Sequence, residues 1–136
     1  MRLGDHCEKI GSGATPRGGK DAYLPTGPYS LIRSQNVHNQ GFSCAGLAYI
    51  SEVQAAALAN VEVRSGDVLV NITGDSVARV CQVDARVLPA RVNQHVTIVR
   101  PQRDALDATF LRYWLVTSAM QNHLLALASA GATRPA

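Results

Sequence analysis

Apolar and polar positions alternate most clearly between residues 66 and 101 of this 136-residue chain. Over residues 91–99 the alternation predicts one strand with an apolar face and a hydrogen-bonding face. The first face would carry Val92, Gln94, Val96 and Ile98, and the second Arg91, Asn93, His95 and Thr97. We therefore expect this stretch to form the centre of a sheet.

A hairpin is predicted just before it. Residues 67–73 alternate in the same way, Gly74, Asp75 and Ser76 favour a turn, and residues 77–83 form the second arm. Polar side chains would gather near the hairpin tip, namely Asn71, Thr73, Ser76 and Arg79. Further strands are expected over residues 30–37 and 46–50, separated by a break at residues 39–41.

Helical periodicity replaces alternation from residue 104 onward. Asp107 is the predicted N-cap of one helix, and Ser118 with Gln121 forms a capping-box pattern for a second. The apolar stripes would consist of Phe110, Leu111, Trp114 and Leu115, followed by Leu124, Leu125 and Leu127. We assign Trp114 to the core rather than to a base-stacking surface. A short helix is also expected after Ser51, with Gln54 completing a capping box.

Composition predicts one ordered domain spanning residues 1–136, because 46% of the residues are hydrophobic and 17% are charged. The first residues lack an apolar signal region, and no apolar run reaches membrane-spanning length. Cys7, Cys44 and Cys81 form no CxxC pair, which favours reduced thiols. A cytoplasmic protein with no membrane association is therefore expected.

The positive charge is small but rich in arginine. The net charge is +3, and of the 13 basic residues only Lys9 and Lys20 are lysine. An arginine side chain can hold a phosphate or a guanine through two hydrogen bonds. GC-rich coding is an alternative explanation for this arginine content.

Residues 11–19 form a glycine-rich loop followed by Lys20. The phosphate-binding P-loop pattern fails there, because Ala14 stands where glycine is needed and Asp21 where serine or threonine is needed. Thr15, Arg17 and Lys20 could still contact a DNA backbone. A purely structural turn is the alternative.

The sequence predicts neither a metal site nor an active site, and no cofactor is expected. His6, His38, His95 and His123 share no ligand spacing. There is no G-x-S-x-G nucleophile motif, and the Gly-Ser-Gly at residues 11–13 does not continue as a dinucleotide-binding motif.

Polar side chains instead form three clusters at predicted strand edges and turns. The clusters are Arg33, Ser34, Gln35 and Asn36; Asn71, Thr73, Ser76 and Arg79; and Arg91, Asn93, Gln94 and His95. Arginine can pair with guanine, and asparagine or glutamine with adenine. Alternatively, such side chains satisfy neighbouring backbone groups. Three clusters without catalytic motifs favour a binding protein.

Five ordered segments extend this interpretation: GSGATP at 11–16, LIRSQNV at 31–37, GDVLVNITG at 66–74, VNQHV at 92–96 and AGATRP at 130–135. Together they resemble a target recognition domain from the specificity subunit of type I restriction-modification enzymes. The resemblance implies an α+β (mixed α/β) fold. Its curved, partly open β-sheet or half-barrel would carry short helices on one side and two C-terminal helices.

The resemblance also implies a function. Such domains are not catalytic, and each reads one half of a bipartite double-stranded DNA target. The implied partners are DNA and the methyltransferase (modification) and restriction subunits of a type I complex. The family normally continues into a long spacer helix and a second recognition domain, and we expect both to be absent here, which puts docking of the methyltransferase subunits in doubt. The alternative is a solitary protein-interaction module that modulates such an enzyme without reading DNA.

Candidate DNA-contacting residues follow from the clusters and the resemblance. They are Thr15, Arg17, Lys20, Arg33, Gln35, Asn71, Ser76, Arg79, Arg91, Asn93 and His95. Motifs shared by domains that read different sequences should build the binding surface rather than choose the bases. Less typical residues are therefore weighed equally as specificity determinants: His38, Asn39, Gln40 and Arg86.

Overall fold

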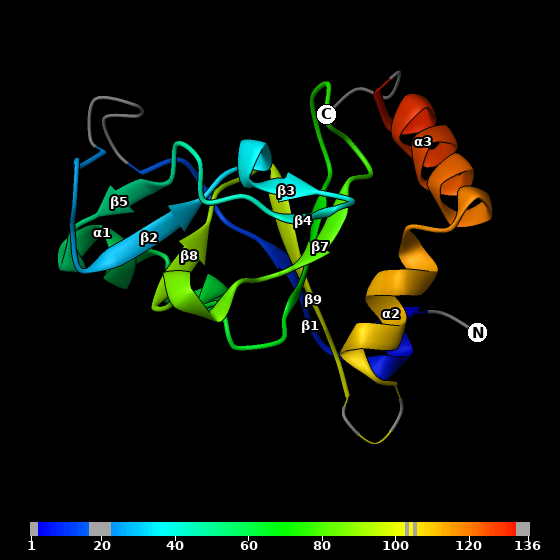
Figure 1. Ribbon diagram of the computed structural model, residues 1–136, viewed down its shortest axis with the longest axis horizontal. Helices are drawn as coiled ribbons and strands as arrows, with labels where there is room; N and C mark the ends of the chain where they lie inside the picture. The colour runs from blue at the N-terminus through cyan, green and yellow to red at the C-terminus, as the bar shows by residue number, and fades with distance from the viewer. Residues whose placement is uncertain (1–2, 17–22, 103, 105, 133–136) are drawn as a thin grey trace.

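The computed structural model describes residues 3–16, 23–102, 104 and 106–132. Within these residues the chain forms a four-stranded sheet, a three-stranded sheet and a two-stranded ribbon (Figure 1). Two helices close the chain on one side of the sheets, and a shorter helix lies at the opposite end. The predicted mixed α+β fold with open sheets and two C-terminal helices is confirmed.

The four-stranded sheet is antiparallel throughout. In order of pairing its strands are β1 (Cys7–Ser12), β9 (Val96–Pro101), β6 (Val68–Asn71) and β7 (Val80–Gln82). The β6–β7 pair confirms the predicted hairpin, but both arms are shorter than predicted, and β7 begins at Val80 rather than at residue 77. All four residues of β6 are buried, because the sheet separates two apolar clusters. Leu69 belongs to one cluster, and Val68 and Val70 belong to the other.

The three-stranded sheet is mixed. Its central strand β2 (Tyr29–Ile32) pairs antiparallel with β5 (Ala48–Ile50) and parallel with β8 (Ala90–Val92). The two-stranded ribbon consists of β3 (Val37–His38) and β4 (Gly41–Phe42).

The strand predicted over residues 30–37 ends at Ile32, so its second half was wrong. A 3-10 turn, η3 (Ser34–Asn36), replaces it. The buried Asn36 side chain accepts from the Arg33 backbone N–H at 2.9 Å and donates to the Ser43 carbonyl at 2.8 Å. These local bonds compete with strand pairing.

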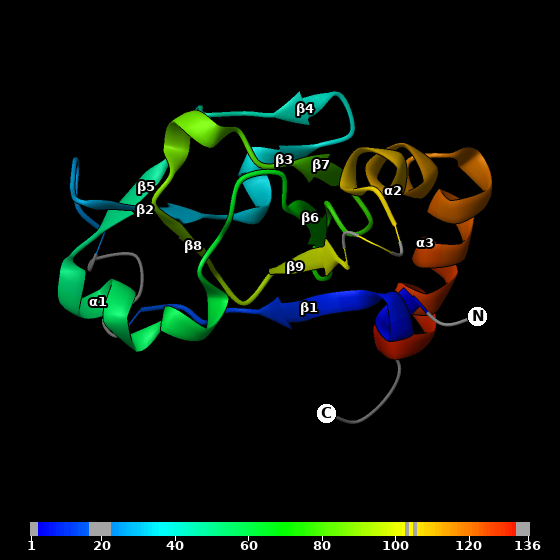
Figure 2. The same ribbon diagram turned by 90° about the horizontal axis from the view of Figure 1, so that it is seen from below.

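The single strand predicted over residues 91–99 was also wrong. It divides into β8 and β9, which belong to different sheets (Figure 2). The division falls at Asn93, whose side chain accepts a hydrogen bond of 3.0 Å from the His95 backbone N–H. A side chain that bonds to the backbone two residues ahead favours a turn over an extended chain. We refer to residues 93–95 as the crossover turn.

The helices begin largely where capping predicts. Helix α1 (Glu52–Ala57) has Ser51 as its N-cap with the complete capping box, and α2 (Ala108–Leu115) is capped by Asp107. Helix α3 (Ser118–Ala132) differs, because the Met120 N–H donates to the Thr117 hydroxyl at 3.4 Å. The predicted box of Ser118 and Gln121 is wrong, since the Gln121 amide bonds to carbonyls outside that turn.

Short 3-10 turns complete the described structure. They are η1 (Leu3–His6), η4 (Ala59–Val61) and η5 (Ala85–Val87). The first precedes β1. No helix in the described residues is long and apolar enough to cross a bilayer.

The predicted apolar stripes are wider than the surface they bury. Leu111 and Leu115 lie in the core, but Phe110 is 61% exposed and Trp114 is 42% exposed. The assignment of Trp114 to the core was therefore wrong. On α3, Leu124 packs against the core, whereas Leu125 and Leu127 are exposed. Each of these two helices contributes side chains to the apolar cluster that contains Val68 and Val70, and the neighbouring apolar positions are exposed.

Candidate nucleic-acid interface

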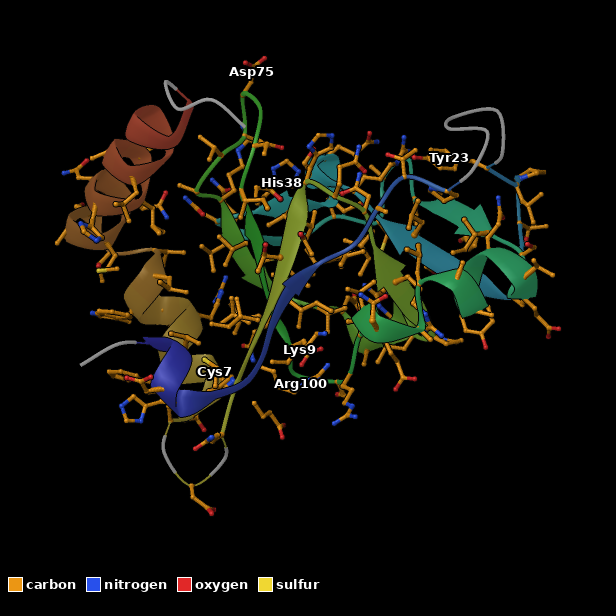
Figure 3. The ribbon with its side chains drawn as sticks, turned by 180° about the vertical axis from the view of Figure 1, so that it is seen from behind. Cys7, Lys9, Tyr23, His38, Asp75 and Arg100 are labelled. Carbon is orange, nitrogen blue, oxygen red and sulfur yellow. The ribbon has the colours of Figure 1, made fainter. Side chains whose placement is uncertain are left out.

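Polar side chains from separate segments meet along one side of the molecule, which we call the polar edge. Its members are Thr15, Tyr23, Arg33, Gln35, His38, Thr73, Ser76, Arg79, Gln94 and His95. Figure 3 shows Asp75, at the tip of the β6–β7 loop, together with His38 and Tyr23 on this side. Lys9, Arg100 and Cys7 lie on the opposite side.

The crossover turn is held from two directions. On one side the Thr15 hydroxyl donates to the Gln94 side-chain oxygen. On the other side Thr73 shares a hydrogen bond with His95 Nδ1, and the Ile72 N–H donates to the His95 carbonyl at 3.0 Å. The turn between the two sheets is thereby fixed against the loop after β1 and against the β6–β7 hairpin.

Asn71 joins the hairpin to η3 from below the surface. Its side chain is 1% exposed, and Nδ2 donates to the Ser34 carbonyl at 3.0 Å and to the Ser76 hydroxyl at 2.9 Å. The Oδ1 atom of Asn71 is buried and has no partner among the described residues. Asn71 therefore organises the polar edge without reaching its surface.

The next contact along the edge fixes the tautomer of His38. The Gln35 carbonyl can only accept, so His38 Nε2, at 2.9 Å, must donate to it. His38 Nδ1 is then the acceptor facing Arg79 Nη1 at 3.4 Å. Gln35 and Arg79 are themselves exposed. The imidazole thus orients an exposed guanidinium toward solvent.

Arg33 and Tyr23 form the far end of the edge. The guanidinium carbon of Arg33 lies 5.1 Å from the centre of the Tyr23 ring. Arg33 Nη2 also donates to the Gly46 carbonyl at 2.6 Å. A stacked and hydrogen-bonded arginine loses little conformational freedom when it meets a ligand.

Three of the predicted DNA-contacting residues are buried rather than exposed at the surface. Besides Asn71, these are Asn93, which is 5% exposed and bonds within the crossover turn, and Arg91, which is 6% exposed. Arg91 Nε donates to the Ala55 carbonyl at 3.1 Å, and its guanidinium lies 4.9 Å from the Tyr29 ring centre. Arg91 thus holds α1 against β8, because an arginine can satisfy several acceptors while its stem packs against apolar groups.

The other predicted contact residues divide into two groups. The structure brings together, at the surface, Thr15, Arg33, Gln35, Ser76, Arg79 and His95. Arg17 and Lys20 lie outside the described residues.

The four less typical residues differ in exposure and in position. His38 belongs to the polar edge and Gln40 is exposed, whereas Asn39 is half-buried and bonds inward to the Val80 N–H at 2.9 Å. Arg86 lies in η5, below β8 in Figure 1, whereas the tip of the β6–β7 loop is at the top. Its guanidinium pairs with Asp84 at 2.6 Å and holds the pKa of that carboxyl at about 2.

Sequence reasoning missed Tyr23 as a member of the edge. It placed Thr73 and Gln94 in polar clusters but not among the candidate contacts. Their importance comes from pairing across long sequence separations: Thr15 with Gln94 is 79 residues, and Thr73 with His95 is 22. No local pattern carries that information.

The opposite side holds a polar cleft of about 650 Å³, lined in part by Glu8, Asp67, Arg100 and Asp107. Asp67 is already paired with Arg100 at 2.7 Å, and Asp107 caps α2. Within the described part of the chain, no three histidine, cysteine or acidic side chains are grouped so that they could hold a metal ion.

The class of fold is the one found in specificity subunits of type I restriction-modification systems, which confirms the fold expected from the sequence. One similar chain comes from structural work on the complex assembly and conformational transition of the type I R-M system. The TM-score is 0.61 at 19% identity, over 85% of this chain and 26% of that chain.

A second is the HsdS subunit from Thermoanaerobacter tengcongensis, with a TM-score of 0.57 at 17% identity, over 96% of this chain and 36% of that chain. The chain thus spans between a quarter and two-fifths of the length of these proteins. No protein-family model matches the sequence, and no curated protein matches it.

Proposed function

We propose that this domain binds double-stranded DNA in a sequence-dependent manner and reads one half of a bipartite target. In this role it is a non-catalytic recognition domain that directs a type I restriction-modification complex to its site. The observation that carries the proposal is the polar edge, where side chains from segments far apart in sequence contact one another on one side of the molecule.

The chemistry of the polar edge suits DNA. Arg33 and Arg79 can bind phosphate or pair with guanine, and Gln35 and Gln94 can pair with adenine. Buried Asn71 and Asn93 hold the backbone beneath them. In the proposed role the crossover turn is the platform and the surrounding exposed side chains read the sequence.

The proposed partners follow from the fold. Modification and restriction subunits would supply the chemistry, and a second recognition domain would read the other half of the target. These partners are inferred from the fold of the similar proteins, of which this chain matches only a part.

The decisive experiment exchanges this domain for one recognition domain of a complete specificity subunit. After reconstitution with the modification subunits, methylated adenines are mapped by sequencing. We expect one half of the methylated site to change while the other half remains. An unchanged site in an active, correctly assembled complex would rule out the proposal.

Direct binding gives a second measurement. Non-specific contacts alone correspond to dissociation constants of roughly 10⁻⁴ to 10⁻⁶ M at physiological salt, and the affinity should fall as salt rises. Fluorescence anisotropy with labelled duplexes over a salt series tests this dependence.

A protein-interaction module is the second candidate. It is favoured by the exposed aromatic side chains of α2, Phe110, Tyr113 and Trp114. Such a module would bind a subunit of the complex with the same affinity in the presence and absence of DNA. It would also show no salt-dependent DNA binding.

A further inference from the structure

The β6–β7 loop contains a residue in an unfavourable backbone conformation. Ala78 has φ of 75° and is buried. Residues other than glycine rarely adopt this left-handed region, because Cβ then approaches the following carbonyl oxygen. The Ala78 N–H donates to the Asn71 carbonyl at 2.8 Å, so the backbone on the N-terminal side of Ala78 is held by the hairpin.

The backbone carbonyl of Ala78 is held by α3. Gln121 Nε2 donates to the Ala78 carbonyl at 2.7 Å and to the Leu115 carbonyl at 2.9 Å. One amide group therefore connects the end of α2 and the start of α3 to a loop 43 residues away in sequence.

Asn39 fixes the orientation of that amide. Its Nδ2 donates to Gln121 Oε1 at 3.3 Å, and its Oδ1 accepts from the Val80 N–H at 2.9 Å. Arg112 of α2 donates to the Asn39 carbonyl at 3.2 Å. The ribbon, the hairpin and both C-terminal helices thus meet at these two side chains, which we call the amide clamp.

The amide clamp lies one residue from a member of the polar edge. Arg79 follows Ala78 directly, and its guanidinium faces His38, which precedes Asn39. If Ala78 relaxed to a negative φ, the chain direction at Arg79 would change and the contact with His38 would be lost. Helix packing and the presentation of Arg79 are therefore mechanically linked.

We propose that Gln121 and Asn39 are positioning residues, which hold the β6–β7 loop in the conformation that presents Arg79 to DNA. This inference rests on the proposed DNA-binding function. It adds a specific dependence of that function on α3, which contributes no member to the polar edge.

The test compares Gln121→Leu with Asn122→Leu, an exposed neighbour on the same helix. Backbone hydrogen exchange at Ala78, measured by NMR without DNA, should be about tenfold faster in Gln121→Leu, because, of the three side-chain hydrogen bonds that this change removes, the one to the Ala78 carbonyl holds the loop closed. Binding to a mixed-sequence duplex at low salt should weaken by about the same factor. Asn122→Leu should match the wild-type chain in both measurements.

A second variant separates positioning from general damage. Glycine adopts φ of 75° without the Cβ penalty, so Ala78→Gly in the Gln121→Leu background should restore a large part of both the exchange protection and the DNA affinity. Destabilisation unrelated to the loop would not be rescued by this change.

Each outcome is informative. Unchanged exchange at Ala78 in Gln121→Leu overturns the amide clamp, whatever the chain does with DNA. Faster exchange with unchanged DNA affinity overturns its role in positioning. A wild-type chain that binds no duplex refutes the proposed function, and with it the positioning role, while the exchange data still report on the clamp.

Discussion

Arg79 and His38 meet across 41 residues of sequence, with Arg79 Nη1 3.4 Å from His38 Nδ1. The imidazole can accept there because its other nitrogen donates to the Gln35 carbonyl. Arg79 is exposed, so its remaining donors face solvent. At this pair the polar edge presents the Arg79 guanidinium in an orientation that His38 already fixes.

Replacing Arg79 should therefore weaken DNA binding. We expect Arg79→Ala to cost about 1–3 kcal/mol of binding free energy if the guanidinium pairs with a base. A phosphate contact would instead lower the salt slope by about one and weaken all sequences alike. Anisotropy titrations over a salt series, with duplexes of different sequence, distinguish the two.

Arg64 provides a control of equal charge. It is exposed and lies beside Lys9 and Arg100, which Figure 3 places on the side away from His38. Arg64→Ala should leave the affinity close to that of the wild-type chain. Equal losses in the two variants would mean that net charge, rather than the polar edge, drives binding.

Gly13 brings the loop after β1 against β8. A Cβ atom on Gly13 would lie 1.8 Å from the Val92 carbonyl oxygen, and the Gly13 N–H donates to the Asn93 carbonyl at 3.0 Å. Gly13→Ala should therefore destabilise the fold by about 2 kcal/mol or more, because backbone must move. Urea unfolding measures the change.

Gly4 is the matched comparison. A Cβ atom added at Gly4 would have the Ile10 side chain as its nearest neighbour, at 3.9 Å. Gly4→Ala should shift the unfolding free energy by less than about 0.5 kcal/mol. A Gly13→Ala chain as stable as Gly4→Ala would contradict the close approach.

Local signals predicted the elements whose causes are local. The caps at Ser51 and Asp107 and the turn at Gly74 each depend on residues within a few positions, and each is confirmed. The strand over residues 91–99 failed because alternation alone does not reveal that the Asn93 side chain bonds to the His95 N–H. The same pattern fits one strand or two strands joined by a turn.

The candidate site was harder to predict because burial depends on tertiary packing. The sequence presents Arg79 and Arg91 as equivalent, yet the first is exposed and the second is 6% exposed beneath α1. Likewise, Gln121 fits a capping box, but its amide reaches the Ala78 carbonyl instead. Which polar group reaches solvent is decided by contacts between distant segments.

A pH-dependent prediction concerns Asp84 in η5. Hydrogen bonds from the Arg86 side chain and backbone lower the pKa of Asp84 from 3.8 to about 2. The pair therefore stabilises the folded chain above about pH 4, and this contribution disappears as the pH falls toward 2. In Arg86→Ala the pKa should return toward 3.8, as measured by NMR titration of the carboxyl carbon. A pKa that stays near 2 would show that the Arg86 side chain is not the cause, since the backbone N–H of residue 86 is kept in this variant.

The last prediction concerns the ion pair on the side away from the polar edge. Arg100 donates to both carboxylate oxygens of Asp67 at 2.7 Å, and the Asp67 side chain is only 2% exposed. Removing one partner of a buried pair leaves an uncompensated charge, which typically costs 3–5 kcal/mol. Asp67 keeps a hydrogen bond of 2.8 Å from the Arg64 backbone N–H, so we expect Arg100→Met to fall near the lower limit, about 3 kcal/mol.

Two comparisons identify the source of that loss in urea unfolding. Arg86→Met removes an ion pair whose arginine side chain is 83% exposed, and its effect should be much smaller, because solvent screens such a pair. Adding Asp67→Asn to Arg100→Met should recover part of the lost stability, since the buried charge is then gone while the amide oxygen can still accept from the Arg64 N–H. If the double variant is less stable than Arg100→Met, hydrogen bonding by the carboxylate, rather than charge compensation, is what Asp67 contributes to the fold.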